Sequence, residues 1–296
     1  MILVVFLYAS LASTFVIAKY VVSHAKPFFT IAFRMLVAGT LLTGYLYIKD
    51  RASCRIDRDD YKLFFKVALF HIYLAFIPEF WALQYVSSIK TNMMYSATPF
   101  IAAFLSFVLL NETLNARKWF GMFLGVTSLT PLFLIASASQ AETSAFFISF
   151  PDVVLFCAVC SASYAWFLVK RLMSRGYQLP LINGVAMLGG GFGALITSLV
   201  FEGITESPVY AWEPFFKGVF LLILVANLLV YNLYGYLLKK YSITFVSLSG
   251  LLCPLFGTLF GWFFLQEPLS WHHALSFVGL SAALYIFQGM DAKQKT

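Results

Sequence analysis

Ten apolar runs divide this chain, and they constrain its fold more than any other feature. A helix needs about 20 apolar residues to cross the hydrocarbon core of a bilayer. The runs occupy residues 2–23, 28–48, 64–86, 92–110, 119–137, 152–169, 180–201, 216–238, 243–264 and 272–288. Of the 296 residues, 61% are hydrophobic and only 11% are charged, whereas soluble domains have about 25% charged residues. We therefore predict an all-α integral membrane protein with ten transmembrane helices.

The distribution of Lys and Arg predicts which face of the membrane each connection occupies. Basic residues concentrate after every second run, as between residues 49 and 66 and between 170 and 175. The connection that carries Glu202 and Glu206 lies on the opposite face. Because basic connections stay in the cytoplasm, we expect both termini on the cytoplasmic side of a bacterial inner membrane. The net charge of +7 expresses this asymmetry, so we infer no nucleic-acid partner from it.

Two stretches of the chain share one spacing of proline and glutamate. Pro99 precedes Glu112 by 13 residues, Pro254 precedes Glu267 by the same number, and the two stretches are 155 residues apart. Each half then holds five helices, an odd number, so the second half enters the membrane from the opposite face, as in transporters with inverted repeats. The predicted division is residues 1–137 and 152–290 for the two repeats, 138–151 for an extracytoplasmic connection and 291–296 for a cytoplasmic tail.

This pattern resembles the drug/metabolite transporter superfamily, in its form with two EamA-type domains. The residues that carry the resemblance are Pro99, Glu112, Leu114, Gly121, Pro254, Glu267, Pro268, Leu269 and Arg34. The second half departs from the pattern, because Met187 stands where an equivalent of Arg34 would lie. The resemblance implies a secondary transporter that moves a small metabolite by alternating access.

A carboxylate and an arginine inside apolar runs are the leading candidates for substrate binding. An acidic side chain within a membrane segment is costly and usually marks a functional site, which makes Glu79, followed closely by Trp81, the first candidate. The alternatives are an ion pair between Glu79 and Arg34, or solvation of Glu79 at the membrane interface near the outer end of its helix. Polar or small side chains on three other runs complete the predicted substrate-binding set, with packing between helices as their alternative role: Asn92, Tyr95, Ser96, Asn227, Tyr231, Tyr234, Ser247 and Gly250.

Four residues have a predicted structural or gating role: Pro99, Pro254, Glu112 and Glu267. A proline inside a helix frees the carbonyl four residues earlier, which here belongs to Tyr95 or Gly250. A carboxylate at a helix end is favourable at the N-terminus of a helix, and we expect each glutamate to cap the helix that follows it.

The candidate residues suit an amino-acid derivative with an added cation and a ring. Glu79 could attract a cation near aromatic rings, and Arg34 could bind a carboxylate. Within the resembled superfamily, S-adenosylmethionine, exchanged for S-adenosylhomocysteine, fits this description. Export of aromatic amino acids is the alternative, and a lipid-flipping or structural membrane protein is the alternative from another class. Catalytic motifs such as H-E-x-x-H and G-x-S-x-G are absent, so we expect no enzyme, cofactor or metal. Coupling to protons or to a counter-substrate, and the oligomeric state, stay open.

Overall fold

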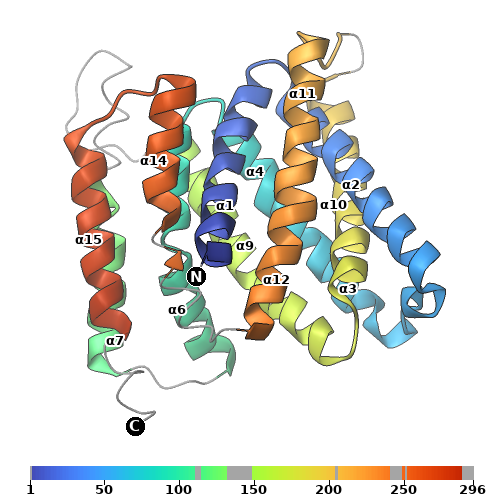
Figure 1. Ribbon diagram of the computed structural model, residues 1–296, viewed down its shortest axis with the longest axis horizontal. Helices are drawn as coiled ribbons and strands as arrows, with labels where there is room; N and C mark the ends of the chain where they lie inside the picture. Colours follow the sequence, from blue (N-terminus) through green and yellow to red (C-terminus); the bar gives the residue numbers. More distant parts are fainter. Residues whose placement is uncertain are drawn as a thin grey trace. The chain divides into compact units, whose positions relative to one another are not determined.

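Helices account for most of the chain in the computed structural model, which describes residues 2–110, 115–131, 149–203, 206–240, 249–250 and 252–288 (Figure 1). The α-helices are α1 Ile2–Val22, α2 Pro27–Lys49, α3 Tyr61–Val67, α4 Leu74–Ala82, α5 Ser88–Tyr95, α6 Thr98–Leu110, α7 Ala116–Thr127, α9 Phe150–Ser174, α10 Leu179–Phe201, α11 Trp212–Leu222, α12 Tyr231–Lys240, α14 Leu252–Leu265 and α15 Trp271–Gln288. Two 3-10 helices, η1 Arg51–Cys54 and η2 Arg58–Asp60, and two π-helices, η3 Ala68–Tyr73 and η5 Ile223–Val230, complete the elements.

Seven helical spans in the described residues are long and apolar enough to cross a membrane. They are Ile2–Val22, Pro27–Lys49, Arg58–Ala82, Ser88–Leu109, Phe150–Ser174, Leu179–Phe201 and Trp212–Leu237, and each coincides with a predicted run. The remaining runs, 119–137, 243–264 and 272–288, coincide with α7, α14 and α15, of which the first two runs lie partly outside the described residues. The chain is therefore an all-α, multi-pass membrane protein, and the count of ten stays a prediction.

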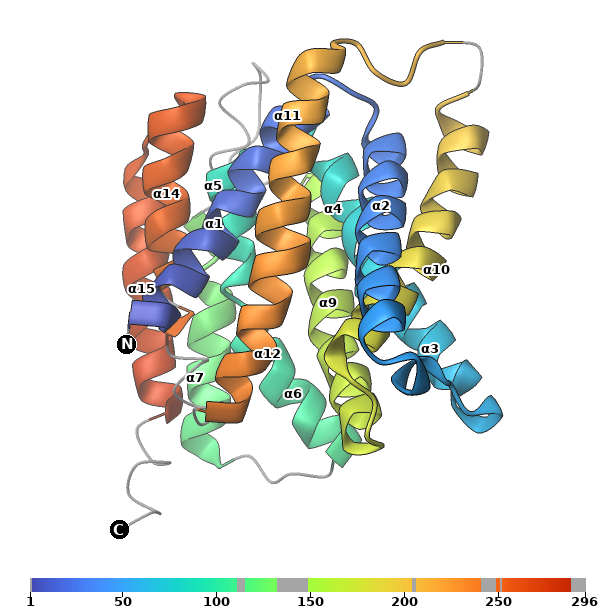
Figure 2. The same ribbon diagram turned by 45° about the vertical axis from the view of Figure 1, so that its right-hand side comes forward.

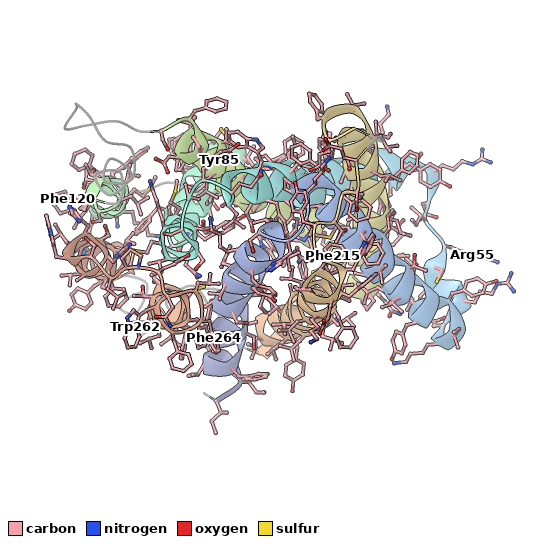
Figure 3. All side chains as sticks on the ribbon, turned by 90° about the horizontal axis from the view of Figure 1, so that it is seen from above. Arg55, Tyr85, Phe120, Phe215, Trp262 and Phe264 are labelled. Atoms are coloured by element: carbon pink, nitrogen blue, oxygen red, sulfur yellow. The ribbon has the colours of Figure 1, made fainter. Side chains whose placement is uncertain are left out.

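Large aromatic side chains on the outside of the helices agree with a lipid environment. Phe120 on α7 and Trp262 and Phe264 on α14 point outward in Figure 3, and each side chain is half exposed or more. Phe215 on α11, by contrast, is fully buried. Soluble proteins rarely expose apolar surface on this scale, so these rings are placed to contact lipid.

The helices group into two compact units, which we call unit 1 and unit 2. Unit 1 contains Met1–Val16, Val86–Phe156 and Tyr236–Thr296, and unit 2 contains Ile17–Tyr85 and Cys157–Gly235. In unit 1, α7 packs against α15 and α5 against α14; in unit 2, α2 packs against α10 (Figures 1 and 2). Each of these pairs joins corresponding helices of the two predicted repeats.

Glycines bring α2 and α10 close together in unit 2. A Cβ atom added to Gly39 would lie 2.9 Å from the carbonyl oxygen of Gly184, and one added to Gly191 would lie 3.0 Å from Cβ of Met35. Small residues allow such close approach of membrane helices. This contact fixes the middle of α2, which carries Arg34.

Both π-helices lie in unit 2, and they interrupt two otherwise α-helical spans. Because η3 begins at Ala68 and η5 at Ile223, they are separated by the 155 residues that relate the two proline–glutamate stretches. A π turn breaks the regular α-helical hydrogen-bond pattern and is frequent at functional sites. The η3 segment carries His71 and the η5 segment carries Asn227, and both side chains are buried.

Candidate functional site

A buried arginine is the centre of the polar cluster in unit 2. Arg34 on α2 is 2% exposed, and its Nε–H donates to Oδ1 of Asn227 on η5 at 2.8 Å. The guanidinium carbon lies 5.0 Å from the ring centre of Phe76 and 5.7 Å from that of Phe80. Glu79, only 4% exposed, is close enough to attract the guanidinium electrostatically. Opposite charges, an amide and two aromatic faces therefore meet inside one apolar bundle.

The amide of Asn227 keeps part of its hydrogen-bonding capacity for a ligand. Its Nδ2 lies 3.5 Å from the sulfur atoms of both Met35 and Met187, and thioethers are weak acceptors. Met187 is the residue that replaces a second copy of Arg34. The substitution leaves one arginine in unit 2 at this level, with an amide beside it that can turn toward a better acceptor.

Four aromatic rings continue the cluster. Tyr231 lies near Arg34, and its ring centre lies 5.3 Å from that of His71 and 6.3 Å from that of Trp166. The rings of Trp166 and His71 are 5.1 Å apart, and those of Trp166 and Tyr234 are 4.8 Å apart. His71 is buried, and neither of its ring nitrogens has a hydrogen-bond partner among the described residues. The group can stack on a flat ligand and offer it hydrogen bonds.

Not every predicted substrate-binding residue of unit 2 joins this cluster. The ring of Trp81 packs on Tyr85 at 4.9 Å, at the end of its helical span, and the side chain of Tyr85 is largely exposed. The structure does bring together five of the predicted residues: Arg34, Glu79, Asn227, Tyr231 and Tyr234. Sequence analysis missed Trp166, because a single aromatic residue in an apolar helix carries no signal of its own.

The predicted residues of unit 1 are engaged in contacts between helices. Asn92 is fully buried; its Nδ2 donates to a backbone carbonyl of α1 at 3.3 Å, and its Oδ1 accepts from Sγ of Cys253 at 3.1 Å. The hydroxyl of Ser96 donates to the backbone oxygen of Asn92 at 3.2 Å, and the ring of Tyr95 lies 4.9 Å from Phe15. These contacts favour the packing role that the sequence left open. Ser247 and Glu112 lie outside the described residues.

Both repeated prolines lie in the first turn of a helix. Pro99 is the second residue of α6 and Pro254 is the third residue of α14, and the first turn is where a helix tolerates proline. The backbone oxygen of Gly250 accepts from the N–H of Cys253 at 3.0 Å. The first turn of α14 therefore supplies a donor to this carbonyl, as in the alternative that the protein itself satisfies the freed group.

The carboxylate of Glu267 caps a helix, but not the one that follows it. Its two oxygens accept from the backbone N–H groups of Ser88 at 2.7 Å and Ile89 at 3.0 Å, and from the Ser88 hydroxyl at 3.0 Å. The helix that it caps is α5, whereas the sequence indicated α15. A helix starts with unpaired N–H groups, and folding brings the start of α5 to this carboxylate.

Glu202 does the same for α2, and sequence analysis missed it. Its carboxylate accepts from the N–H groups of Phe28 at 2.7 Å and Phe29 at 2.9 Å, while Lys26 donates to its backbone oxygen at 2.8 Å. Because Glu202 follows an apolar run, the sequence suggested only a solvated connection. The observed bonds fasten the ends of α10 and α2 together.

A buried ion pair in unit 1 was also missed. Lys90 Nζ lies 2.6 Å from Asp152 Oδ1, and the side chains are 5% and 0% exposed. The other oxygen of Asp152 accepts from the N–H and the hydroxyl of Ser149, at 3.1 and 2.7 Å. The sequence offers no means of matching Lys90 with a residue 62 positions away.

The fold and the buried cluster together define a multi-pass membrane protein with the chemistry to hold a small charged molecule inside a helical unit. The described residues contain no group of three His, Cys, Asp or Glu side chains that could bind a metal. The chain belongs to the EamA-like transporter family, whose sequence pattern matches residues 1–134 and 149–288. It is therefore a transporter and not an enzyme, as predicted.

Relatives extend this assignment over most of the chain. The S-adenosylmethionine/S-adenosylhomocysteine transporter of Chlamydia trachomatis serovar D is 34% identical over 258 residues, which cover 86% of this chain and 79% of the relative. The protein of the same name from Chlamydia muridarum is 33% identical over 258 residues, covering 86% and 81%. A solved crystal structure at 14% identity shares the fold over 100% of this chain and 97% of its own, with a TM-score of 0.66.

Proposed function

We propose that this protein carries S-adenosylmethionine across the bacterial inner membrane in exchange for S-adenosylhomocysteine. The observation that carries the proposal is the 34% identity to chlamydial transporters named for these two compounds. The buried cluster of unit 2 supports it, because it combines a cation, an anion and stacked aromatic rings. S-adenosylmethionine likewise combines a carboxylate, an ammonium and a sulfonium with a flat adenine ring.

Arg34 and Asn227 are the proposed binding groups for the amino-acid end. A guanidinium can hold a carboxylate through two parallel hydrogen bonds, and within the described parts of the chain only the Nε–H of Arg34 donates a hydrogen bond, to Asn227. Glu79 would then meet the ammonium or the sulfonium of the same ligand. Both charged groups are buried in the described conformation, so binding requires the helices around them to open toward the substrate.

The aromatic rings are the proposed binding groups for adenine and the sulfonium. Trp166 can stack on the base, and the unpaired nitrogens of His71 can donate to it or accept from it. Tyr231 and Tyr234 present ring faces that attract a cation, an interaction of about 0.5–2 kcal/mol. A neutral sulfur, as in S-adenosylhomocysteine, would lose that attraction but keep the stacking.

We infer further that the chain has ten transmembrane helices in two inverted repeats, with both termini in the cytoplasm. The matched positions of η3 and η5 support the repeat. Within unit 2, connections with opposite charges lie at opposite ends: Arg175 pairs with Asp60 in the basic connections, and Lys26 contacts Glu206, 3.4 Å away, at the other end. Inverted repeats allow a central site to open alternately to either face.

Counterflow in proteoliposomes tests the proposed substrate. Vesicles that contain the purified protein and are loaded with S-adenosylhomocysteine should accumulate labelled S-adenosylmethionine, and unloaded vesicles should accumulate less. Phenylalanine and tryptophan as competitors test the alternative of aromatic amino-acid export. Transport of those amino acids without transport of S-adenosylmethionine would replace the proposal with that alternative.

Glu79→Gln separates recognition of the sulfonium from general damage, because it keeps the shape of the side chain and removes its charge. It should weaken uptake of S-adenosylmethionine at least tenfold, about 1.4 kcal/mol, and affect S-adenosylhomocysteine less. The matched control is Glu206→Gln at an exposed carboxylate, which should leave both unchanged. Equal loss of both substrates in Glu79→Gln would assign Glu79 to structural pairing with Arg34.

A further inference from the structure

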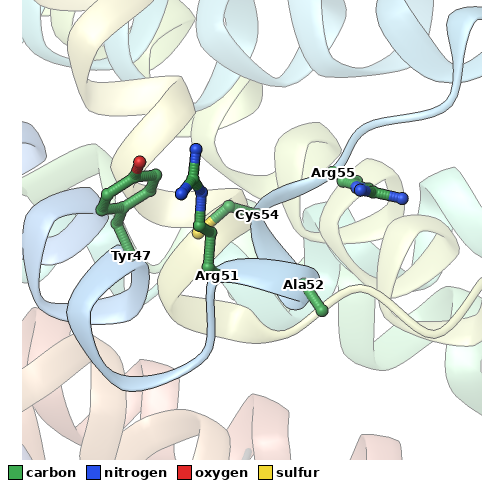
Figure 4. Close-up of a pocket in the computed structure, with 5 residues that line it drawn as sticks. All are labelled: Tyr47, Arg51, Ala52, Cys54 and Arg55. Carbon is green, nitrogen blue, oxygen red and sulfur yellow. The ribbon is translucent and has the colours of Figure 1, made fainter.

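A hollow of about 480 Å³ opens where α2 ends and η1 begins. Its lining residues are Tyr47, Arg51, Ala52, Cys54 and Arg55, and Figure 4 shows them. Tyr47 belongs to the last turn of α2, and the other four follow the end of that helix. Along α2, Tyr47 is 13 residues from Arg34, or about 20 Å at the rise of an α-helix. The hollow is therefore distinct from the buried cluster.

The hollow is positively charged. Two of its five lining residues are arginines and none is acidic. The guanidinium of Arg51 lies 5.0 Å from the ring centre of Tyr47, and Figure 4 shows Arg55 apart from this pair, with Cys54 between them in that view. Among the described residues, neither guanidinium has a carboxylate partner. Two unpaired guanidinium groups around a hollow form a site for an anion, and planar guanidinium groups suit phosphate oxygens in particular.

The carboxylate of Asp50, which precedes Arg51 in the chain, bonds to Ser53. Asp50 accepts from the N–H of Ser53 at 3.3 Å and also from the Ser53 hydroxyl. Gln178 reaches the same network, with its Nε2 donating to the Ser53 hydroxyl at 2.8 Å. These bonds engage both oxygens of the Asp50 carboxylate, which does not belong to the lining of the hollow. They also connect η1, which carries Arg51 and directly precedes Arg55, to the start of α10.

The surroundings of the hollow are those of a membrane–water boundary. Ile48, which follows Tyr47 in α2, is 88% exposed, which an apolar side chain tolerates where it meets acyl chains. Tyrosine is enriched at the level of the lipid headgroups, and Tyr47 and Tyr45 on α2 are both about half exposed. Lys49 adds a third cation at this level, with its Nζ 5.5 Å from the ring centre of Tyr45.

We propose that this hollow binds the phosphate of an anionic phospholipid headgroup from the leaflet at this end of α2. Arg51 and Arg55 would bind the phosphate oxygens, Tyr47 would lie at the glycerol level, and the acyl chains would descend along the exposed side chains of α2. A free phosphate shares only the first of these contacts. Basic clusters next to a transmembrane helix attract anionic lipids through their surface charge.

Thermal unfolding of the purified full-length protein in mixed micelles tests the proposal. Phosphatidylglycerol should raise the unfolding temperature above the value in phosphatidylcholine at equal lipid content, because binding to the folded state stabilises it. Inorganic phosphate and glycerol 3-phosphate, at the same concentration of phosphate, should give no comparable rise. A rise with these soluble anions equal to that with phosphatidylglycerol would overturn the lipid assignment in favour of a soluble phosphate site.

Paired variants locate the effect. Arg51→Gln with Arg55→Gln should weaken the dependence on phosphatidylglycerol at least tenfold in apparent affinity. Arg58→Gln removes an exposed charge from the same connection but not from the hollow, and it should keep the dependence. Equal loss in Arg58→Gln would overturn the site in favour of general attraction by the basic connection.

Native mass spectrometry of the unaltered protein covers the case in which the double variant does not fold. With phosphatidylglycerol and phosphatidylcholine present in equal amounts, phosphatidylglycerol should be retained preferentially. Equal retention of the two lipids would refute the proposal.

Discussion

Neutralising one member of the buried Lys90–Asp152 pair should destabilise the protein more than neutralising both members at once. Lys90→Met keeps most of the aliphatic chain, and Asp152→Asn keeps the shape of the carboxylate. Either change alone leaves the remaining charge buried, with side chains that are 5% and 0% exposed in the native pair. The double variant leaves no charge at this position.

The magnitude follows from that burial. Removing one partner of a buried ion pair typically costs about 3–5 kcal/mol, whereas replacing both partners by neutral groups of similar volume is often close to neutral. Ser149 gives Asp152 two hydrogen bonds, which a neutral amide oxygen can still accept in part. We therefore expect each single variant to lose about 3 kcal/mol or more, and the double variant to lose less than either one.

The assay is a double-mutant cycle on the free energy of unfolding in mixed micelles, followed by tryptophan fluorescence. The exposed pair Glu213–Lys217, at 2.6 Å and spaced i,i+4, is the matched control. Its two charges are solvated, so its coupling should fall within the error of the measurement.

Additive losses in the Lys90–Asp152 cycle would refute this reasoning. They would mean that the two charges do not compensate each other in the folded protein. A double variant that is less stable than both single variants would lead to the same conclusion.

Three further predictions use matched positions. Gly257→Ala should lower the free energy of unfolding by about 1–3 kcal/mol, because its methyl group would collide with the buried amide side chain of Asn92. Gly44→Ala adds a methyl group in open space and should not lower the free energy of unfolding. Equal effects of the two substitutions would contradict the steric argument. Glu202→Ala should cost about 0.5–2 kcal/mol through loss of the cap on α2, whereas Glu206→Ala should not measurably change the unfolding curve. On a background without native cysteines, a maleimide that cannot cross membranes should label Arg55→Cys only from the cytoplasm and Glu206→Cys only from outside; labelling of both from one face would contradict the inverted topology.

The helices could be predicted from the sequence because a membrane span depends on local composition. Each of the seven spans coincides with an apolar run, and the polar side chains buried in the runs indicated Arg34, Glu79 and Asn227. Those three residues have a local signal, since a polar group in an apolar run needs a partner.

The partners of these residues could not be predicted in the same way. Glu267 was expected at the next helix but caps one that starts 179 residues earlier, and Asp152 pairs with Lys90, which precedes it by 62 residues. Hydropathy does not state which helices become neighbours. The π-helices could not be predicted from the sequence either, because η3 and η5 have the same apolar composition as the α-helical turns around them.

The cap on α5 has a consequence for the order of events during synthesis. Ser88 leaves the ribosome 179 residues before Glu267, which at 5–20 residues per second amounts to about 10–35 s. In the same way, 174 residues are synthesised between Phe28 at the start of α2 and Glu202, which accepts its N–H. Through that interval the early helices enter the bilayer before the carboxylates that will accept their first N–H groups have been made. A nascent chain released before Glu267 would leave the start of α5 without its acceptor, and such fragments should be handed to membrane proteases.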